Sequence, residues 1–186
     1  MLHYICYLRK HMSDVYVASM LSNIFKYKSE KIGKLLDAGN HELKFENTSL
    51  NGNDEFSSVL TIYIANKKKI LKLGIYNSLL FGIRVSRYMK AEVIVSDESD
   101  DPYQWILIRD SQIFWAEELS TDGEGITLLD SSEKELFYDK ALALLPGKDT
   151  LEDPSYNSWS FTISPSSLWN NCIKYSPNKE HSSMTE

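Results

Sequence analysis

The stretch YQWILIRDSQIFWA, residues 103–116, decides the fold class. It holds two short runs rich in β-branched and aromatic residues, Tyr103–Ile108 and Gln112–Ala116, with Asp110 and Ser111 between them. Two such runs separated by a short polar turn are typical of a β-hairpin. Because a hairpin joins antiparallel strands, this stretch predicts an antiparallel sheet and not a set of β-α-β crossovers.

Stretches of similar composition lie on both sides of this hairpin and are joined by short polar turns. We therefore predict an α+β fold: an antiparallel sheet of about six or seven strands with helices packed on one face. The further predicted strands are residues 42–46, 59–65, 70–76, 79–85, 91–95 and 156–163.

Helices are predicted where apolar residues recur with a period of about 3.6. Each of these stretches also carries a residue that commonly begins or ends a helix. The predicted helices are residues 13–25 with Ser13 or Asp14 as the cap, 29–38 ended by Gly39, 132–145 opened by the capping box of Ser132 and Glu135, and a last helix that begins at Ser164–Pro165.

Length and composition are those of an ordinary globular chain. The sequence has 186 residues, of which 42% are hydrophobic and 25% charged, so extensive disorder is excluded. We expect a single domain over residues 1–175 and a flexible polar tail over residues 176–186. Cys6 and Cys172 are too few for the disulfide framework of a small secreted protein.

The sequence shows neither a signal peptide nor a membrane-spanning stretch. The apolar start of the chain, Met1–Leu8, ends at Arg9 and is too short for the hydrophobic region of a signal peptide. The uncharged stretch 73–83 is likewise shorter than the roughly 20 residues that a membrane-spanning helix needs. We therefore expect a cytoplasmic protein that makes no membrane contact.

Charge is distributed unevenly along the chain. Residues 1–95 carry 14 Lys and Arg against 8 Asp and Glu, a net charge of +6. Residues 96–160 carry 4 against 16, a net charge of −12, within a total of −6. The two segments could neutralise each other through surface ion pairs of about 0–1 kcal/mol each. Alternatively, the acidic segment forms a surface that attracts a basic protein.

The sequence lacks the patterns of common catalytic and metal sites. Its four histidines are widely spaced, and none has the close partner that zinc ligands usually have. The acidic run 97–101 begins like a calcium-binding loop, but Pro102 and Ile108 stand where glycine and glutamate are required. Walker, dinucleotide and nucleophile-elbow motifs are absent. We expect no catalytic residue, no metal and no cofactor; a small enzyme with an unrecognised site is an alternative.

Nucleic-acid binding is a further alternative, because basic residues and tyrosines alternate in the first half of the chain. We rank it below protein binding, since the isoelectric point is about 5.3 and the carboxylates of residues 96–160 repel phosphate. A nucleic-acid binder would place its basic residues on one open face. These residues are Lys67, Lys68, Lys69, Lys72, Arg84 and Arg87.

Aromatic residues are frequent in the acidic segment, and aromatic anchors beside carboxylates suit the binding of a basic protein. In size, charge and lack of catalytic motifs the chain resembles the small acidic immunity proteins that bacteria pair with basic secreted toxins, often nucleases. The resemblance implies a basic toxin or effector as partner, with carboxylates covering its phosphate-binding path, and no cofactor. The residues predicted to bind the partner are Asp97, Glu98, Asp100, Asp101, Trp115, Glu117, Glu118, Asp122 and Glu124.

Overall fold

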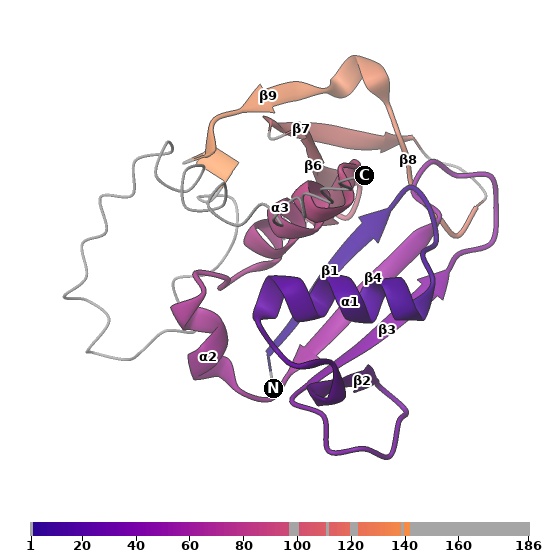
Figure 1. Ribbon diagram of the computed structural model, residues 1–186. Helices are drawn as coiled ribbons and strands as arrows, with labels where there is room; N and C mark the ends of the chain where they lie inside the picture. Colours follow the sequence, from indigo (N-terminus) through magenta and orange to yellow (C-terminus); the bar gives the residue numbers. More distant parts are fainter. Residues whose placement is uncertain (1, 97–100, 111, 120–122, 139, 142–186) are drawn as a thin grey trace, which may run out of the picture. The chain divides into compact units, whose positions relative to one another are not determined.

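The computed structural model describes residues 2–96, 101–110, 112–119, 123–138 and 140–141, all within the unit Met1–Lys148 (Figure 1). The elements are β1 (Leu2–Leu8), α1 (Asp14–Phe25), β2 (Ile32–Lys34), β3 (Leu43–Ser49), β4 (Ser58–Ile64), α2 (Lys67–Lys72), α3 (Ser78–Met89), β5 (Val93–Ser96), β6 (Gln104–Arg109), β7 (Gln112–Leu119), β8 (Thr127–Leu128) and β9 (Lys134–Leu136), with 3₁₀ turns at Ser29–Lys31 and Asp130–Ser132.

These strands form one sheet in the order β2-β3-β4-β1-β5-β6-β7-β8, and β9 pairs with β7 as well. Every pair is antiparallel except β2 with β3. The α+β class and the mostly antiparallel sheet are confirmed. The predicted six or seven strands are too few, because the sheet has nine. Strands β2, β8 and β9 have only two or three residues each, which is too short for a recognisable alternation.

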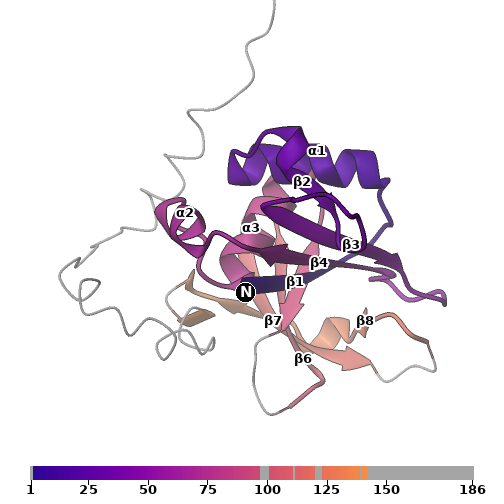
Figure 2. The same ribbon diagram turned by 90° about the horizontal axis from the view of Figure 1, so that it is seen from below.

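Helices α1 and α3 lie on the same side of the sheet (Figures 1 and 2). They bury their apolar residues against alternate residues of the strands, such as Tyr4, Cys6 and Leu8 of β1. Helix α3 approaches the sheet closely at Gly82. A Cβ atom there would lie 2.8 Å from Ile108 Cδ1 and 2.9 Å from Val95 Cγ1, so this position requires glycine for packing.

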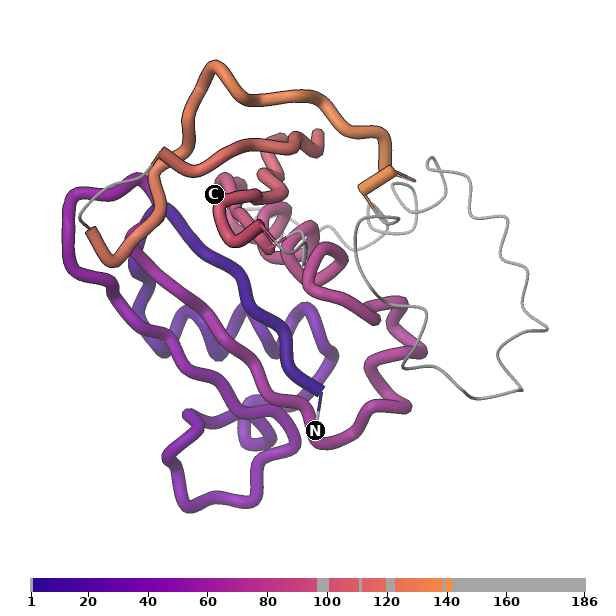
Figure 3. Tube along the Cα trace, turned by 180° about the vertical axis from the view of Figure 1, so that it is seen from behind, coloured from indigo at the N-terminus to yellow at the C-terminus, as the bar shows by residue number. Residues whose placement is uncertain are grey.

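The opposite face of β5, β6 and β7 carries a second, smaller apolar cluster. Loop residues cover it: Phe56, from the segment before β4, forms a β-bridge with Ile126, from the segment before β8. These two segments lie side by side in both views (Figures 1 and 3). Within the cluster, the ring of Tyr7 meets Trp105 edge to face at a centroid distance of 5.1 Å. The sheet is therefore packed on both faces near β6 and β7.

One predicted strand is a helix, and another is helical in part. Residues 79–85 lie within α3, whereas in the predicted strand 70–76 only residues 70–72 belong to α2 and residues 73–76 form a turn and a loop. The side chains of Asn66 and Asn77 cap the first turns of α2 and α3. Helix α3 buries several consecutive residues, among them Leu79 to Gly82, so its sequence has no single apolar stripe. Because short apolar runs are compatible with a buried helix or strand, periodicity alone could not decide between them.

In the described residues, the predicted helix 29–38 is not formed and the predicted helix 132–145 does not begin at Ser132. Residues 29–38 form a 3₁₀ turn, strand β2 and a loop. In the predicted helix 132–145, β9 occupies Lys134–Leu136, and the described helical residues are only Tyr138, Lys140 and Ala141. The Ser132 hydroxyl accepts from Glu117 N at 2.8 Å and donates to the Leu129 carbonyl at 2.6 Å. It therefore fixes this segment to β7 and caps no helix.

The other predictions hold where they can be compared. The first helix begins after Ser13, whose hydroxyl accepts from Tyr16 N at 3.3 Å. Each of the strands β3, β4, β5, β6 and β7 corresponds to a predicted strand. Strands β6 and β7 form the expected hairpin. The predicted strand 156–163, the last helix and the tail 176–186 lie outside the described residues.

Candidate functional site

Four of the predicted partner-binding residues, Asp97, Glu98, Asp100 and Asp122, lie outside the described residues. The other five are described, and the structure brings only some of them together. Most of their positions follow from the pairing of β6, β7 and β8.

Three hydrophobic side chains are exposed at one end of the sheet, where β6 begins and β7 and β8 end. Tyr103 is 57% exposed, Leu119 46% and Leu129 37%. Backbone hydrogen bonds connect their segments: Glu118 N donates to Tyr103 O at 2.8 Å, Leu129 N donates to Glu117 O at 2.8 Å, and Leu119 pairs with Thr127. By this register Leu119 and Leu129 share the face of Glu117, and Tyr103 shares the face of Glu118. Exposed apolar side chains near one sheet end are typical of interaction sites.

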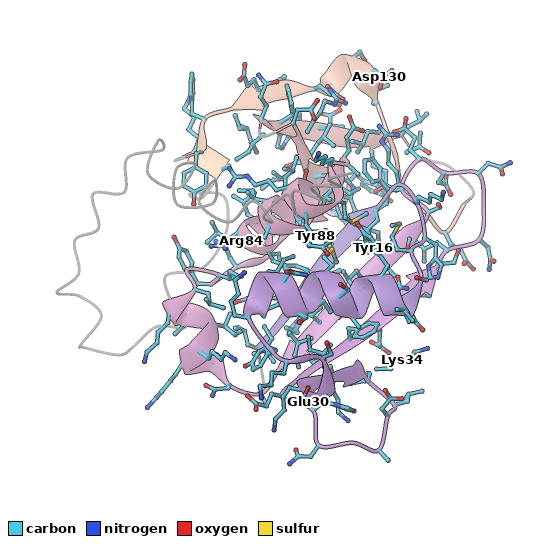
Figure 4. The ribbon with its side chains drawn as sticks, in the orientation of Figure 1. Tyr16, Glu30, Lys34, Arg84, Tyr88 and Asp130 are labelled. Carbon is cyan, nitrogen blue, oxygen red and sulfur yellow. The ribbon has the colours of Figure 1, made fainter. Side chains whose placement is uncertain are left out.

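Carboxylates lie on the same segments as these three side chains. Glu117 lies opposite Gln104 at the end of the hairpin, and Glu118 follows it. Asp130 begins the 3₁₀ turn that follows β8 and projects at the top of Figure 4. The acidic tip is defined here as Asp101, Tyr103, Glu117, Glu118, Leu119, Leu129 and Asp130.

The carboxylates of the acidic tip have different local roles. Asp101 accepts from Tyr103 N at 3.0 Å and from Gln104 Nε2 at 2.9 Å, so it shapes the turn before β6. Glu118 accepts from the indole Nε1 of Trp105 at 2.8 Å. Burial raises the pKa of Tyr7, and the Glu118 charge raises it further. Glu118 is therefore tied to the second apolar cluster.

The side chains of Glu117 and Asp130 are exposed. Neither side chain makes a hydrogen bond or ion pair with the residues that the structure describes. Their charges are available to a partner. They are the two members of the acidic tip best suited to steer a basic protein.

Glu124 and Trp115 lie outside the acidic tip. Glu124 accepts from the backbone N of Asn51 at 3.1 Å, so it holds the loop before β4 against the segment after β7. Trp115 is half-buried on β7, and the ammonium of Lys134 lies 4.9 Å from its ring centre. Because Lys134 covers this ring, Tyr103 is the more accessible aromatic residue. Sequence reasoning missed Tyr103, since nothing in a strand pattern shows which aromatic residue stays exposed.

The ion pairs of the described residues do not neutralise the acidic segment with bases from the first half. Four of the six join residues within 1–95: Arg9–Glu55, Arg9–Glu92, Lys31–Glu42 and Lys34–Asp14. A fifth, Arg109–Glu133, lies within the acidic segment. The sixth, Arg109–Glu92, joins the two segments, but its base comes from the acidic segment and its acid from the basic one.

Four of these pairs form a connected network, with Glu92 at its centre and Glu55 and Glu133 at its ends. Glu92 accepts from both Arg9 and Arg109, and Arg109 also makes two hydrogen bonds of 2.8 Å to Glu133. Burial acts to raise the pKa of Glu92, but the hydrogen bonds from the two arginines outweigh it and hold this pKa below its usual value. The network joins β1, β5, β6 and the segment before β9, so it is a structural feature of the sheet.

One serine lies close to a histidine, as in many catalytic pairs. Ser58 Oγ lies 3.3 Å from His11 Nδ1, but this hydroxyl donates to the Thr48 carbonyl at 3.2 Å and Ser58 is fully buried. A substrate has no access to it, so the contact is structural. Among the described residues, no three His, Cys, Asp or Glu side chains are grouped so that they could hold a metal ion.

Comparison of the chain with protein-family models, with curated protein sequences and with solved structures gave no significant match. In the part of the chain that the structure describes, no helix combines the length and the apolar character needed to cross a membrane.

Proposed function

We propose that the chain is a non-enzymatic binding module whose acidic tip docks a basic protein, as an immunity protein does with its toxin. The partner is a basic toxin or effector domain, and a nuclease fits this description well. Under this proposal the protein acts in the cytoplasm and needs no cofactor.

The observation that carries the proposal is the combination of free carboxylates and exposed apolar side chains in one place. Glu117 and Asp130 have no cationic partner among the described residues. They lie at the same end of the sheet as Tyr103, Leu119 and Leu129, which expose a large part of their surface. Exposed charges accelerate the encounter with an oppositely charged protein, and apolar anchors supply much of the binding energy after docking.

The chemistry of the acidic tip also fits a nucleic-acid-cleaving partner. Such an enzyme presents cationic side chains to the phosphates of its substrate. Carboxylates can occupy the positions of these phosphates and so block the substrate path. Tyr103 would then dock against the apolar part of the same surface.

The test begins with a pull-down from the native lysate at low and at high salt, followed by rate measurements with the basic protein recovered. We expect Glu117→Lys to slow association several-fold, because long-range attraction is lost. Tyr103→Ala should instead speed dissociation, because an anchor acts only after docking. Glu30→Lys is the matched control: Glu30 is an exposed carboxylate on the 3₁₀ turn after α1 (Figure 4).

Two results would overturn the proposal. One is an association rate that does not respond to salt or to Glu117→Lys. The other is an equal loss of association in Glu30→Lys, because the effect would then come from net charge and not from the acidic tip. Thermal unfolding of all three variants shows whether any binding defect comes from loss of structure.

A further inference from the structure

Helix α2 is fixed to the rest of the fold by three contacts. Ile70 is fully buried in the main core. The ammonium of Lys69 lies 3.3 Å from the ring centre of Tyr27 and donates to the Lys26 carbonyl at 3.3 Å. At the other end, Arg84 Nη2 of α3 donates to the Leu73 carbonyl at 2.9 Å, and Figure 4 shows Arg84 on the side of α3 near α2. Lys69 and Arg84 are therefore structural cations.

The remaining lysines of this region are exposed. Lys26 and Lys28 flank Tyr27, so the contact between Lys69 and the Tyr27 ring brings them next to α2. Two separate segments thus contribute to one cationic surface. The basic face is defined here as Lys26, Lys28, Lys67, Lys68 and Lys72.

The contacts of the described residues do not account for Lys28, Lys68 and Lys72. Lys68 and Lys72 are four residues apart on α2, a spacing at which like charges repel and weaken a helix. Lys28, Lys68 and Lys72 form no ion pair with the described residues, and Lys31 already pairs with Glu42 at 3.4 Å. A cationic surface that weakens its own helix indicates an anionic partner.

The basic face is separate from the acidic tip. Helix α2 follows the end of β4, and both Figure 1 and Figure 2 show it on the other side of this unit from β8. The exposed carboxylate on the adjoining segment is Glu30. Repulsion of phosphate by the carboxylates of the acidic tip therefore has less weight at α2, because screening limits such repulsion to about 8 Å at physiological salt.

We propose that the basic face binds the phosphate backbone of a nucleic acid without sequence preference. Ammonium groups contact phosphates without reading the bases. In the described chain, none of the exposed large hydrophobic residues lies on α2 or on residues 26–28, so the face offers no ring on which bases could stack. The same lack of exposed apolar residues disfavours binding to a membrane surface. Helices at a membrane interface insert an apolar face, whereas α2 buries its apolar residue Ile70 in the core of the protein.

This inference does not depend on the proposed function, because the two surfaces share no residue. The experiment measures binding of a fluorescent mixed-sequence DNA duplex to the full chain by anisotropy, over a range of salt concentrations. The test variant is Lys68→Glu with Lys72→Glu. The matched control is Lys10→Glu with Lys140→Glu, which changes the net charge equally at two exposed lysines outside the basic face.

We expect affinity for the duplex to fall with salt, with a log–log slope of about −0.9 for each phosphate contacted. The test variant should bind at least about tenfold more weakly and lower the magnitude of this slope by about 2, since two contacts are lost. The control should change affinity by less than about threefold. Unchanged thermal unfolding shows that both variants are folded.

Three outcomes would overturn the inference. The first is no salt-dependent binding of the duplex, and the second is an equal loss in the control variant. In the third outcome, the native chain binds phosphatidylserine vesicles or a polyglutamate peptide but not the duplex, and the test variant loses this binding. The basic face would then serve a membrane or an acidic protein.

Discussion

Replacing Arg109 by methionine removes the central cation of the ion-pair network while keeping an unbranched side chain over the Phe114 ring. The guanidinium carbon of Arg109 lies 5.3 Å from that ring centre. The side chains of Arg109, Glu92 and Glu133 are 32%, 21% and 19% exposed, so the pairs are neither fully buried nor freely solvated. Surface pairs contribute about 0–1 kcal/mol, whereas breaking a buried pair costs about 3–5 kcal/mol.

We expect Arg109→Met to lower the free energy of unfolding by about 2 kcal/mol at pH 7, between these two limits. Both carboxylates contribute to this cost: Glu92 loses one of its two arginine partners, and Glu133 loses two hydrogen bonds of 2.8 Å. For a chain of this size the loss corresponds to a decrease in Tm of about 4–8 °C. Urea unfolding followed by tryptophan fluorescence measures it.

The pH dependence gives a second, independent check. Because the pKa of Glu92 is lower in the folded state than in the unfolded state, its pairs stabilise the fold above the unfolded value of about 4.3. This stability is lost as the pH falls through the folded pKa. The difference between the native chain and Arg109→Met should therefore shrink toward zero near pH 3. A difference that is equal at pH 3 and pH 7, or below about 0.5 kcal/mol at pH 7, refutes the reasoning.

Three further changes test the packing. Gly82→Ala should destabilise the fold by about 1–2 kcal/mol in urea unfolding, because crowding against Ile108 and Val95 exceeds the gain in helix propensity of about 1 kcal/mol; adding Ile108→Val, which removes Cδ1, should recover much of the loss. A stabilised Gly82→Ala would contradict this. Glu118→Ala should cost about 1–3 kcal/mol by leaving the Trp105 indole N–H unpaired, whereas Glu117→Ala should change stability by less than about 0.5 kcal/mol; equal effects would count against the distinction. In a Cys172→Ser chain, Cys6 should resist Ellman's reagent until urea is added, because the thiol is fully buried and burial raises its pKa; rapid labelling in native buffer would disprove this.

Local signals in the sequence were sufficient for several elements. Helix α1 combines an N-terminal cap at Ser13 with an apolar stripe that includes Val17, Leu21 and Phe25, and both features act within the helix itself. Strands β6 and β7 combine β-forming residues with a short turn at Asp110, which adopts a left-handed conformation with a φ of 46°. Such elements are decided by neighbours in the sequence, so the sequence alone predicts them.

Other elements depend on contacts between distant residues. Strand β1 buries Tyr4, Cys6 and Leu8, but its other face carries Ile5 and Tyr7, so no polar residues mark the alternation over most of the strand. It was missed because it lies between β4 and β5 with apolar residues on both faces. Parts of α2 and α3 were taken for strands for a related reason, since burial on several sides removes the periodic signal that distinguishes the two structures.

The sequence predicted that the candidate site is acidic, but not which of its side chains are exposed. The −12 segment is visible in the sequence, yet the roles of its carboxylates are decided by register. Glu117 and Glu118 are adjacent, and the alternation of β7 leaves the first exposed while the second reaches the Trp105 indole. Likewise, Tyr103 and not Trp115 is exposed, because Lys134 of β9 lies over the Trp115 ring. Neither result follows from composition.

The ion pairs explain how a chain with opposite charges in its two halves keeps both surfaces. In the described part of the basic segment, Glu55 and Glu92 pair with arginines, so two of its few carboxylates are already neutralised. In the acidic segment, Arg109 is held by Glu133 and Glu92. Among the described residues, these minority charges are therefore paired, in part within their own segment and in part through Arg109–Glu92. Neutralisation of the acidic tip by the basic face would instead have paired Lys68 or Lys72 with Glu117 or Asp130. The described ion pairs therefore leave these four side chains to the cationic and anionic partners that we propose.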